Sequence, residues 1–545
     1  MENVLDIRVN NEKIQEHINK LFTEILKEQK KYMGVKKPDE EKSHLTEDLL
    51  KKYESMRGKG FFYNYMSSGR GHGPFTELVD GSIKYDLIGG IGPNLLGHSH
   101  PLYIKAQLES ATSDTIMCGN LQPYPEAYQL TEALIQNVSK KSRLKNFWFT
   151  GSGSFANDLA LKLIWQKQNP KYRVIAFNKA FAGRSVATQD LTHNKGYKEG
   201  MPDTVQVDHV PHFDQTNPEQ SLENTISEIK RVMKENPKQH CAIMMEIIQG
   251  EGGFIYGDKA YYEGVFKFAK DNGLYIWVDE VQTFGRTREL FAYQMMGLDE
   301  YVDIVSVGKA LQACGVLYTD ELNPKPGLIA GTFNGSLSAL NTGHKIIKYL
   351  TESHFYGDKG RNAEIENAFL SRFEHLMKTS CRDKITYAGG SGTMIAYEVG
   401  DSSKETTMKF IRKLFENGIL CFMCGADPTR VRMLLPLSLT DEHIDEIFKN
   451  KILTKRQLEK KYKIQFTGKE VLLLQHPVTT QSKLSKIQIS NTLNALSKIK
   501  NQTIAIMPNS DSGNKAIFKQ LSNFAKKYHF VKTFRTLPRE DYLGM

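Results

Sequence analysis

Asp303–Val316 reads DIVSVGKALQACGV and places a lysine directly after a run of residues typical of a buried strand. Ile304, Val305 and Val307 are β-branched, and a glycine ends the run. A lysine at a partly desolvated strand end can have its pKa lowered towards neutrality, so that its free amine attacks a carbonyl. Lys309 is therefore a candidate to form an imine. Taken alone, a surface lysine with its charged end in water explains the pattern better.

Short apolar runs alternate with longer amphipathic segments on both sides of this stretch. Between residues 61 and 335 the apolar runs read FWF, VIAF, AIMMEII, LYIWVDE and VDIVSV, and the amphipathic segments include Asn157–Gln168 and Tyr261–Lys270. This alternation predicts an α/β domain in which helices cover both faces of a mostly parallel sheet.

The flanking regions predict three further parts. Residues 1–60 are polar and helix-prone, interrupted by KKPDEEKSH, and predict an N-terminal helical arm. Residues 336–450 begin with a long helix and continue with TMIAYEV and VRMLLPL, which predicts a smaller α+β domain. In residues 451–545 a basic helix precedes the strands VLLLQHP and TIAIMPN, which flank a helix at Ile487–Ile499 and predict a partial α/β segment.

Composition and charge exclude several classes of protein. The 545 residues are 40% hydrophobic and 25% charged, as in globular chains with more than one domain. No apolar run is long enough to span a bilayer and the N-terminus is charged, so we expect no membrane partner and a cytoplasmic location. Much of the net charge of +10 lies in helical stretches such as KRQLEKKYK, which favours a solvated face over a nucleic-acid surface.

The six cysteines are scattered, and we expect reduced thiols. Cys421 and Cys424 form the pair CFMC, but no second pair stands at a spacing that would complete a metal site. We therefore expect a buried structural pair and no metal.

Polar residues follow two more of the predicted strands, where ligands of parallel sheets collect. In FWFTGSGSFAND, the residues Ser152, Gly153 and Ser154 open a helix whose N–H groups can bind a phosphate, although a plain serine cap explains them too. In LYIWVDEVQ, the buried Asp279 needs a partner such as a protonated ring nitrogen, or an ion pair with Arg286.

These three features together describe one kind of site. A phosphate-binding turn, a carboxylate for a ring nitrogen and an imine-forming lysine are the protein groups that pyridoxal 5'-phosphate requires. The combination favours this cofactor over three separate structural explanations.

Longer stretches resemble the class III aminotransferases, the relatives of ornithine and acetylornithine aminotransferase. The resemblance rests on GGIGPNLLGHSHP, EIIQGEGGFIYGDKAYYEGV and VDEVQTFGRTRELFAYQMMGLDEYVDIVSVGKA, and it covers about residues 61–448. GKALQACGV is more similar to the lysine 6-aminotransferase branch than to the acetylornithine branch. The resemblance implies fold type I, with a mostly parallel seven-stranded sheet, and a homodimer with shared active sites.

The resemblance also implies roles for single residues. Lys309 matches the lysine that carries the cofactor, Asp279 the partner of the pyridine nitrogen, and Gln282 the residue near the ring hydroxyl. The remaining matches are the phosphate turn at Ser152, Gly153 and Ser154, the ring-stacking Phe181, Thr332 for the neighbouring subunit's phosphate, and Arg432 for a substrate carboxylate.

Three positions depart from the family pattern. Ala182 stands where relatives usually have histidine, Phe155 where a glutamate is common, and the DEVQ motif reaches Phe284 with one glycine fewer. These departures concern the substrate pocket more than the cofactor.

The implied activity is a ping-pong transfer of an amino group from an amino acid, including a terminal amine, to an oxo acid or another carbonyl compound. The amine of Lys309 would move the proton between donor and cofactor. Two alternatives stay open: an aminomutase or decarboxylase that uses the same cofactor, and a non-catalytic scaffold in an amino-sugar pathway.

Residues from about 452 to 545 resemble the middle of a hydrolysing UDP-N-acetylglucosamine 2-epimerase, through VLLLQHPVTTQ, NTLNALSKI, TIAIMPNSDSGNKAIFKQL and REDYL. His476 matches a functional histidine of that family. The family's catalytic acids and the rest of its nucleotide-binding half have no counterpart here, so we expect no epimerase catalysis and a structural role for His476.

Overall fold

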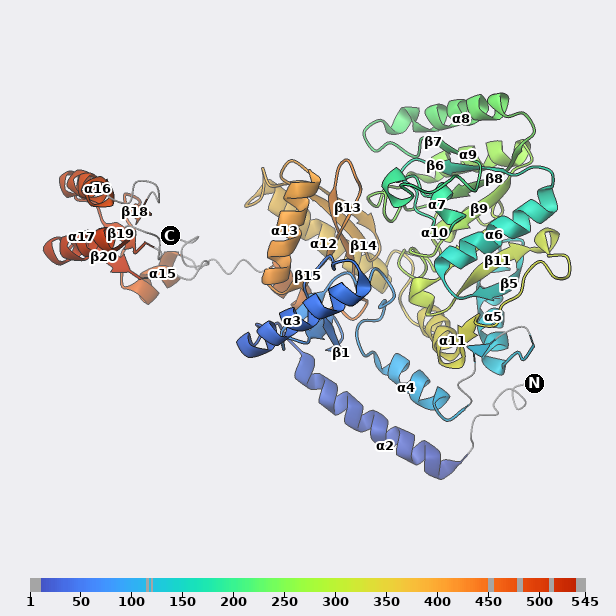
Figure 1. The fold of residues 1–545 in the computed structure, drawn as a ribbon, viewed down its shortest axis with the longest axis horizontal. Coiled ribbons are helices and arrows are strands. Elements are labelled where there is room, and N and C mark those ends of the chain that lie inside the picture. The colour runs from blue at the N-terminus through green and yellow to red at the C-terminus, as the bar shows by residue number, and fades with distance from the viewer. Residues whose placement is uncertain are drawn as a thin grey trace. The chain divides into compact units, whose positions relative to one another are not determined.

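The computed structural model describes residues 11–113, 117–118, 121–448, 455–477, 484–508 and 514–535 of the chain (Figure 1). By its internal contacts the chain divides into two compact units, Met1–Ile444 and Asp445–Met545. The domain boundaries at residues 60, 335 and 450 stay predictions.

The first unit is built on a seven-stranded sheet with the order β5-β11-β10-β9-β8-β6-β7. Every neighbouring pair is parallel except those of β11, which runs antiparallel to β5 and β10. The predicted mostly parallel sheet is confirmed, and each of the five apolar runs forms one of its strands. The bounds are β5 Leu144–Thr150, β6 Arg173–Phe177, β7 Val207–Val210, β8 His240–Met245, β9 Tyr275–Asp279, β10 Ile304–Val307 and β11 Cys314–Thr319.

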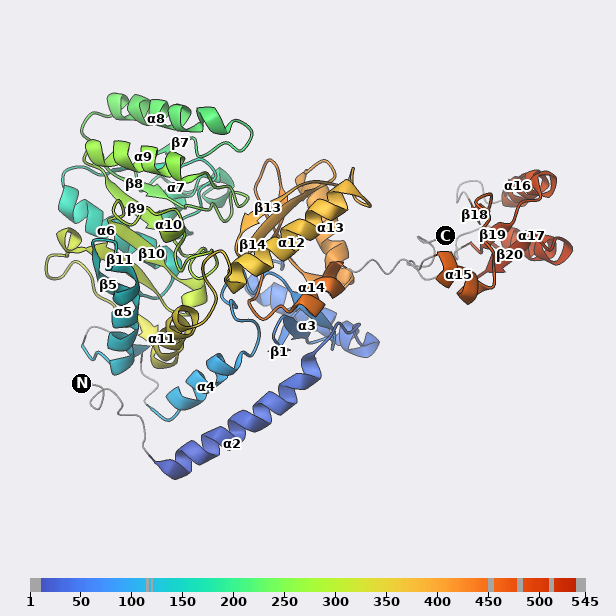
Figure 2. The same ribbon diagram turned by 180° about the vertical axis from the view of Figure 1, so that it is seen from behind.

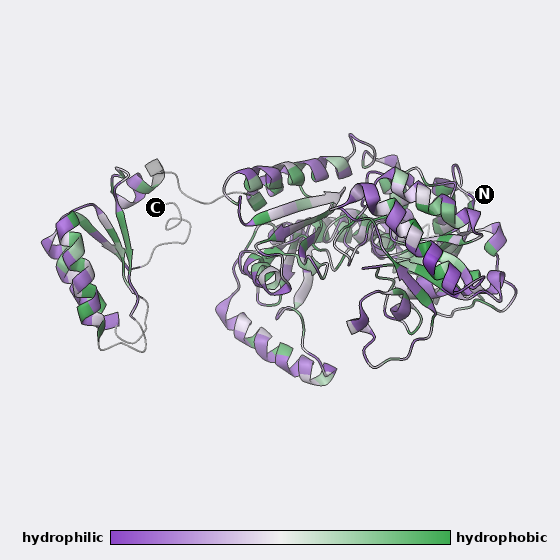
Figure 3. Cartoon of the chain, turned by 90° about the horizontal axis from the view of Figure 1, so that it is seen from above, coloured by the Kyte–Doolittle hydropathy of each residue, from purple (hydrophilic) through white to green (hydrophobic). Residues whose placement is uncertain are grey.

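Helices lie on both faces of this sheet. Figure 1 shows α6 (Gly153–Gln168) in front of the strands, and Figure 2, from behind, shows α5 (Pro125–Val138) and α9 (Lys259–Asp271) on the other face. Apolar residues of α6 form one buried cluster with the central strands, including Trp277 and Val316. In Figure 3 the strands are mainly hydrophobic, whereas the outer helices mix hydrophilic and hydrophobic residues. This pattern is expected when the strands are buried and each helix has one face in water.

The remaining elements of the first unit lie beside this domain (Figures 1 and 2). The predicted long helix is α11 (Leu337–Glu352). It leads to α12 (Arg361–Lys378), α13 (Lys404–Glu416) and an antiparallel sheet of order β13-β14-β17-β16. These strands are β13 Ile385–Ser391, β14 Met394–Val399, β16 Phe422–Cys424 and β17 Arg430–Leu434.

The N-terminal arm contains two long helices, α2 (Glu12–Gln29) and α3 (Glu40–Arg57). The interruption seen in KKPDEEKSH is short, because Asp39 caps α3 and the helix begins inside that motif. A small sheet, β1-β2-β3-β15, follows the arm and joins Ser67–His72, Phe75–Leu78 and Ile83–Asp86 to Ile419–Leu420.

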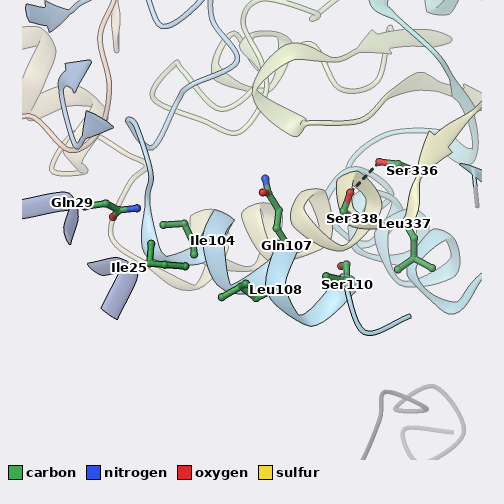
Figure 4. A pocket seen from close by; sticks show the side chains of 10 residues that line it. Ile25, Gln29, Ile104, Gln107, Leu108, Ser110, Ser336, Leu337 and Ser338 are labelled. Carbon is green, nitrogen blue, oxygen red and sulfur yellow. Dashed lines mark hydrogen bonds between the residues drawn. The ribbon is translucent and has the colours of Figure 1, made fainter. Parts of the chain in front are cut away.

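A cavity of about 530 Å³ lies between α2, α4 (Pro101–Ser110) and the start of α11 (Figure 4). Ile25, Ile104 and Leu108 make one part of its lining apolar, and Ser336 and Ser338 lie at its other end. Neither Lys309 nor Asp279 lines this cavity.

The second unit contains a three-stranded parallel sheet of order β18-β19-β20, with β18 Val471–Leu474, β19 Thr503–Ile506 and β20 Val531–Phe534. Its helices are α15 Lys455–Tyr462, α16 Ser485–Ile499 and α17 Asn514–Lys527. This arrangement confirms the predicted α/β alternation. His476 is exposed just after β18, and the REDYL motif falls outside the described residues.

Candidate active site

A cavity of about 370 Å³ lies at the carboxyl ends of β5, β6, β8, β9 and β10. It brings together residues far apart in the sequence, because parallel strands end at the same edge of a sheet. Seven of the predicted cofactor residues line it: Ser152, Gly153, Ser154, Phe181, Asp279, Gln282 and Lys309. Thr332 is exposed and does not line it.

Lys309 follows β10 and faces this cavity, so it is not a surface lysine. Burial is the main cause that lowers the pKa of its amine to about 8, and the positive charge of Arg432 adds to the effect. Its backbone has φ = +46°, a left-handed conformation that lysine rarely adopts. Such a conformation persists only where the surrounding structure holds it.

Asp279 ends β9 with a buried carboxylate. It accepts hydrogen bonds from Asn157 Nδ2 at 2.7 Å and from the Val281 N–H at 2.9 Å. Burial raises its pKa, while these two hydrogen bonds oppose the rise.

The alternative ion pair between Asp279 and Arg286 is wrong. The buried Arg286 guanidinium donates to the carbonyl oxygens of Gly92 and Leu435, at 2.6 and 3.3 Å. Within the described ranges Asp279 forms no ion pair, which leaves its carboxylate for a cationic group in the cavity.

The turn from β5 into α6 forms one wall. Ser152 caps α6 by accepting from the Phe155 N–H, so the serine cap exists alongside the cavity lining. A Cβ on Gly153 would lie 2.7 Å from Val281 Cγ1, which is closer than carbon atoms pack. The first N–H groups of a helix have no partner within it, so this glycine-lined turn suits a phosphate.

Gln282 supplies a second sign that the cavity holds a polar ligand. Its Oε1 is buried and has no hydrogen-bond partner among the described residues. Buried polar atoms are nearly always paired, so this acceptor fits a donor such as the ring hydroxyl of the cofactor. Gly250 lies against Gln282 and has no room for a Cβ.

Three residues that the sequence analysis missed complete the site. Asn157 on α6 donates to Asp279, and Glu246 follows β8 and accepts the N–H groups of Phe181 and Gly250, at 2.9 and 3.0 Å. Burial and the nearby Asp279 raise the pKa of Glu246 to about 8. Glu251 lines the cavity from the same loop. Polar residues that directly follow a predicted strand are candidates for the site. The same rule, applied to AIMMEIIQGEGG, identifies both glutamates.

Arg432 reaches the site through Glu251. It is fully buried on β17, and its Nη1 lies 2.6 Å from Glu251 Oε1. Its Nε and Nη2 are buried without a partner in the described part of the chain. Glu251 therefore pairs with only one nitrogen of this guanidinium, and a carboxylate that takes its place can bind the others as well.

The departures from the family pattern leave the cofactor cavity open. Ala182 borders it and packs in the core beside α6. Phe284 is fully buried against Phe291, with ring centres 5.2 Å apart. Phe155 is 59% exposed and lines a neighbouring pocket with Phe333.

The family model of the class-III aminotransferases matches residues 59–453. The chain belongs to the class-III aminotransferase family. Acetylornithine aminotransferase of Bacillus anthracis is 28% identical over 379 residues, which cover 68% of this chain and 90% of that protein. The Bacillus cereus enzyme of the same name is 29% identical over 396 residues, covering 70% and 94%.

Solved structures have the same fold. A lysine aminotransferase from M. tuberculosis has a TM-score of 0.63 and 18% identity, covering 73% of this chain and 97% of its own. An omega transaminase from Pseudomonas jessenii in complex with PMP has a TM-score of 0.63 and 20% identity, covering 70% and 91%. This aminotransferase therefore has fold type I and uses pyridoxal 5'-phosphate. Its membership of an aminotransferase family favours amino transfer over the mutase, decarboxylase and scaffold alternatives.

Cys421 and Cys424 are buried free thiols, and burial raises the pKa of both, that of Cys424 to about 12. The described ranges contain no cluster of three metal-binding side chains. None of the helices among the described residues has the length and apolar character needed to cross a membrane.

Proposed function

We propose that this aminotransferase takes the amino group from the terminal amine of an amino acid and passes it to an oxo acid, in ping-pong fashion, at Lys309. The observation that carries the proposal is that Lys309 and Asp279 face one cavity, beside a helix N-terminus suited to phosphate. The structures of a lysine aminotransferase and an omega transaminase share this fold.

Each residue would contribute a different part of the chemistry. Pyridoxal phosphate, when bound, supplies a ring that accepts the electron pair left on the donor carbon. Asp279 would hold a proton on the ring nitrogen, and Gln282 would orient the ring through its hydroxyl. Lys309 Nζ would first hold the cofactor and then, once the donor amine has replaced it, carry the proton from the donor carbon. Phe181 would pack on the ring, and Ser152, Gly153 and Ser154 would bind the phosphate.

The ion pair between Arg432 and Glu251 supports a terminal-amine donor. While Glu251 pairs with Arg432, its negative charge repels a donor that has a carboxylate on the reacting carbon. A donor that reacts through a terminal amine has no carboxylate on that carbon, so it is not repelled. An oxo acid has to displace Glu251 to reach Arg432, and the unpaired Nε and Nη2 can bind its carboxylate.

Turnover with defined donors tests the proposal. Protein loaded with pyridoxal phosphate is mixed with lysine, ornithine or acetylornithine, with alanine as the donor that lacks a terminal amine, and 2-oxoglutarate is the acceptor. We expect glutamate to form with at least one terminal-amine donor, and Lys309→Ala to lower kcat by about 10³-fold. Full turnover by Lys309→Ala would overturn the proposal.

We also propose a homodimer with shared active sites. Phe155 and Phe333 are 59% and 68% exposed and line a pocket that shares Gly151 with the cofactor cavity. Exposed aromatic side chains of this kind are typical of an interface. A second copy on this surface would bury both rings and bring Thr332 to the partner's phosphate. Sedimentation of wild type and Phe333→Asp tests this: a dimer and a monomer are expected, and a monomeric wild type would exclude it.

For the remaining features we propose a cytoplasmic location and a distant relationship of residues 451–545 to sugar-nucleotide epimerases. The family model ends at residue 453, and the second unit has its own parallel sheet. Adding UDP-N-acetylglucosamine and following its hydrolysis tests catalysis by this unit, and we expect none.

A further inference from the structure

Two arginines of β17 reach the loop that carries Glu251. Arg430 and Arg432 are two residues apart on the strand, so their side chains lie on the same face of the sheet, and both are buried. Arg432 pairs with the Glu251 carboxylate, whereas Arg430 Nη1 donates to the carbonyl oxygen of Gly253 at 2.8 Å. One arginine therefore binds the side chain of the loop at residues 249–255, and the other binds its backbone.

The guanidinium of Arg430 is held on several sides. Its Nε donates to Glu398 Oε1 at 3.0 Å, and its Nη1 also donates to Gln215 Oε1 at 3.2 Å. The ring centre of Tyr387 lies 4.1 Å from its central carbon. A buried group with charged, polar and aromatic partners is a fixed anchor rather than a mobile one.

The loop backbone is attached to the β16–β17 region without the Glu251 carboxylate. The Gly425 N–H donates to the carbonyl oxygen of Glu251 at 2.7 Å, and Arg430 holds Gly253 two residues further on. These two bonds remain when the carboxylate leaves Arg432. The side chain can therefore exchange with a substrate carboxylate while its backbone stays in place.

We propose that Arg430 is a positioning residue that holds residues 249–255 on β17, so that Glu251 covers Arg432 whenever no substrate carboxylate is there. The inference rests on the proposed roles of Arg432 and Glu251. Its consequence concerns donor choice: Arg430 maintains the preference for a terminal amine without touching the donor.

The test compares single-turnover kcat/KM of the loaded enzyme for its best terminal-amine donor with that for glutamate. We expect Arg430→Met to lower the ratio of these two values about tenfold, and Arg430→Lys, which keeps one donor for Gly253, to restore part of it. A merely structural loss would lower both values together and leave the ratio unchanged. The melting temperature and the cofactor spectrum show that each variant is folded and loaded.

Lys179→Met is the matched control. Lys179 Nζ donates to the carbonyl oxygen of Asp427 at 2.9 Å, another contact between the large sheet's loops and the β16–β17 turn that does not involve residues 249–255. We expect this variant to keep the wild-type ratio. An equal fall in Lys179→Met would attribute the effect to general loosening and overturn the proposal.

A double-variant cycle identifies the route. If Arg430 acts through Glu251, then Arg430→Met changes the ratio no further once Glu251→Gln is present. An additive effect would overturn the inference. The proposed function fails instead if wild type transfers no amine, or if Glu251→Gln keeps the ratio of the two kcat/KM values. Only the role of Arg430 fails if Glu251→Gln lowers that ratio and Arg430→Met does not.

Discussion

Lys309 combines a strained backbone with an amine that is easy to deprotonate. The left-handed φ of +46° turns the chain sharply after β10, and the preceding Gly308 has no room for a side chain because its Cβ would lie 2.9 Å from Cys314 Sγ. The pKa of about 8 leaves roughly a quarter of the amine neutral at pH 7.5, against about a thousandth for an ordinary lysine. Backbone and burial together present a nucleophile to the cavity.

This pKa predicts the pH dependence of cofactor loading. Because only the neutral amine attacks an aldehyde, the rate of covalent loading of the cofactor-free protein should rise with pH and reach half its maximum near pH 8. Stopped-flow absorbance with pyridoxal phosphate measures this rate. A midpoint near 10 would show that burial does not lower the pKa of Lys309.

Gly153 predicts a steric requirement at the phosphate turn. Gly153→Ala would push against Val281, so we expect pyridoxal phosphate to bind about tenfold more weakly, measured by fluorescence titration. Adding Val281→Ala removes the clash and should restore most of the affinity. An unchanged Kd in the single variant would contradict the close packing.

At the scale of elements, Asn157 joins α6 to the end of β9 and to the segment after β6. Its Nδ2 lies 2.7 Å from both Asp279 Oδ2 and the carbonyl oxygen of Ala182. One side chain therefore fixes the carboxylate and a wall of the cavity.

Asn157→Leu should weaken catalysis, because leucine cannot donate a hydrogen bond to Asp279. A lost hydrogen bond to a buried carboxylate costs about 2 kcal/mol, so we expect kcat to fall roughly 30-fold. Because the Asn157 bond lowers the pKa of Asp279, the acid limb of the pH–rate profile should move to higher pH. Thr192→Val is the control, because Thr192 binds the Ala182 N–H and not Asp279, and it should leave that limb in place. A profile that does not move in Asn157→Leu would refute the link.

The sequence predicts the strands better than the partners of buried polar side chains. Apolar runs such as LYIWVDE mark strands by themselves, because the strands of a parallel sheet are buried on both faces. The partner of Arg286 depends instead on Gly92 and Leu435, which are remote in the chain, so the predicted pair with Asp279 is wrong. The role of Arg430 could not be predicted for the same reason, because its partners come from four separate segments of the chain: Gln215, Gly253, Tyr387 and Glu398.

At the scale of the whole molecule, the aminotransferase family accounts for residues 59–453, and the second compact unit begins at Asp445. All the residues assigned to the cofactor cavity belong to the first unit. The site is therefore complete without the three-stranded sheet of the second unit, apart from the contribution proposed for a second copy.

Deletion of residues 454–545 should leave transamination intact. We expect kcat/KM within about twofold of the full chain, measured with the best donor and 2-oxoglutarate. Loss of activity in a truncated protein that still binds pyridoxal phosphate would assign the second unit a part in the reaction.

The most direct test of the account is to find which lysine holds the cofactor. Borohydride reduction of the loaded protein fixes pyridoxal phosphate to its lysine, and peptide mass spectrometry locates the added mass. We predict that it lies on Lys309 and is lost in Lys309→Ala. Modification of a different lysine, or none in a protein that transfers amino groups, would contradict the assignment of the active site.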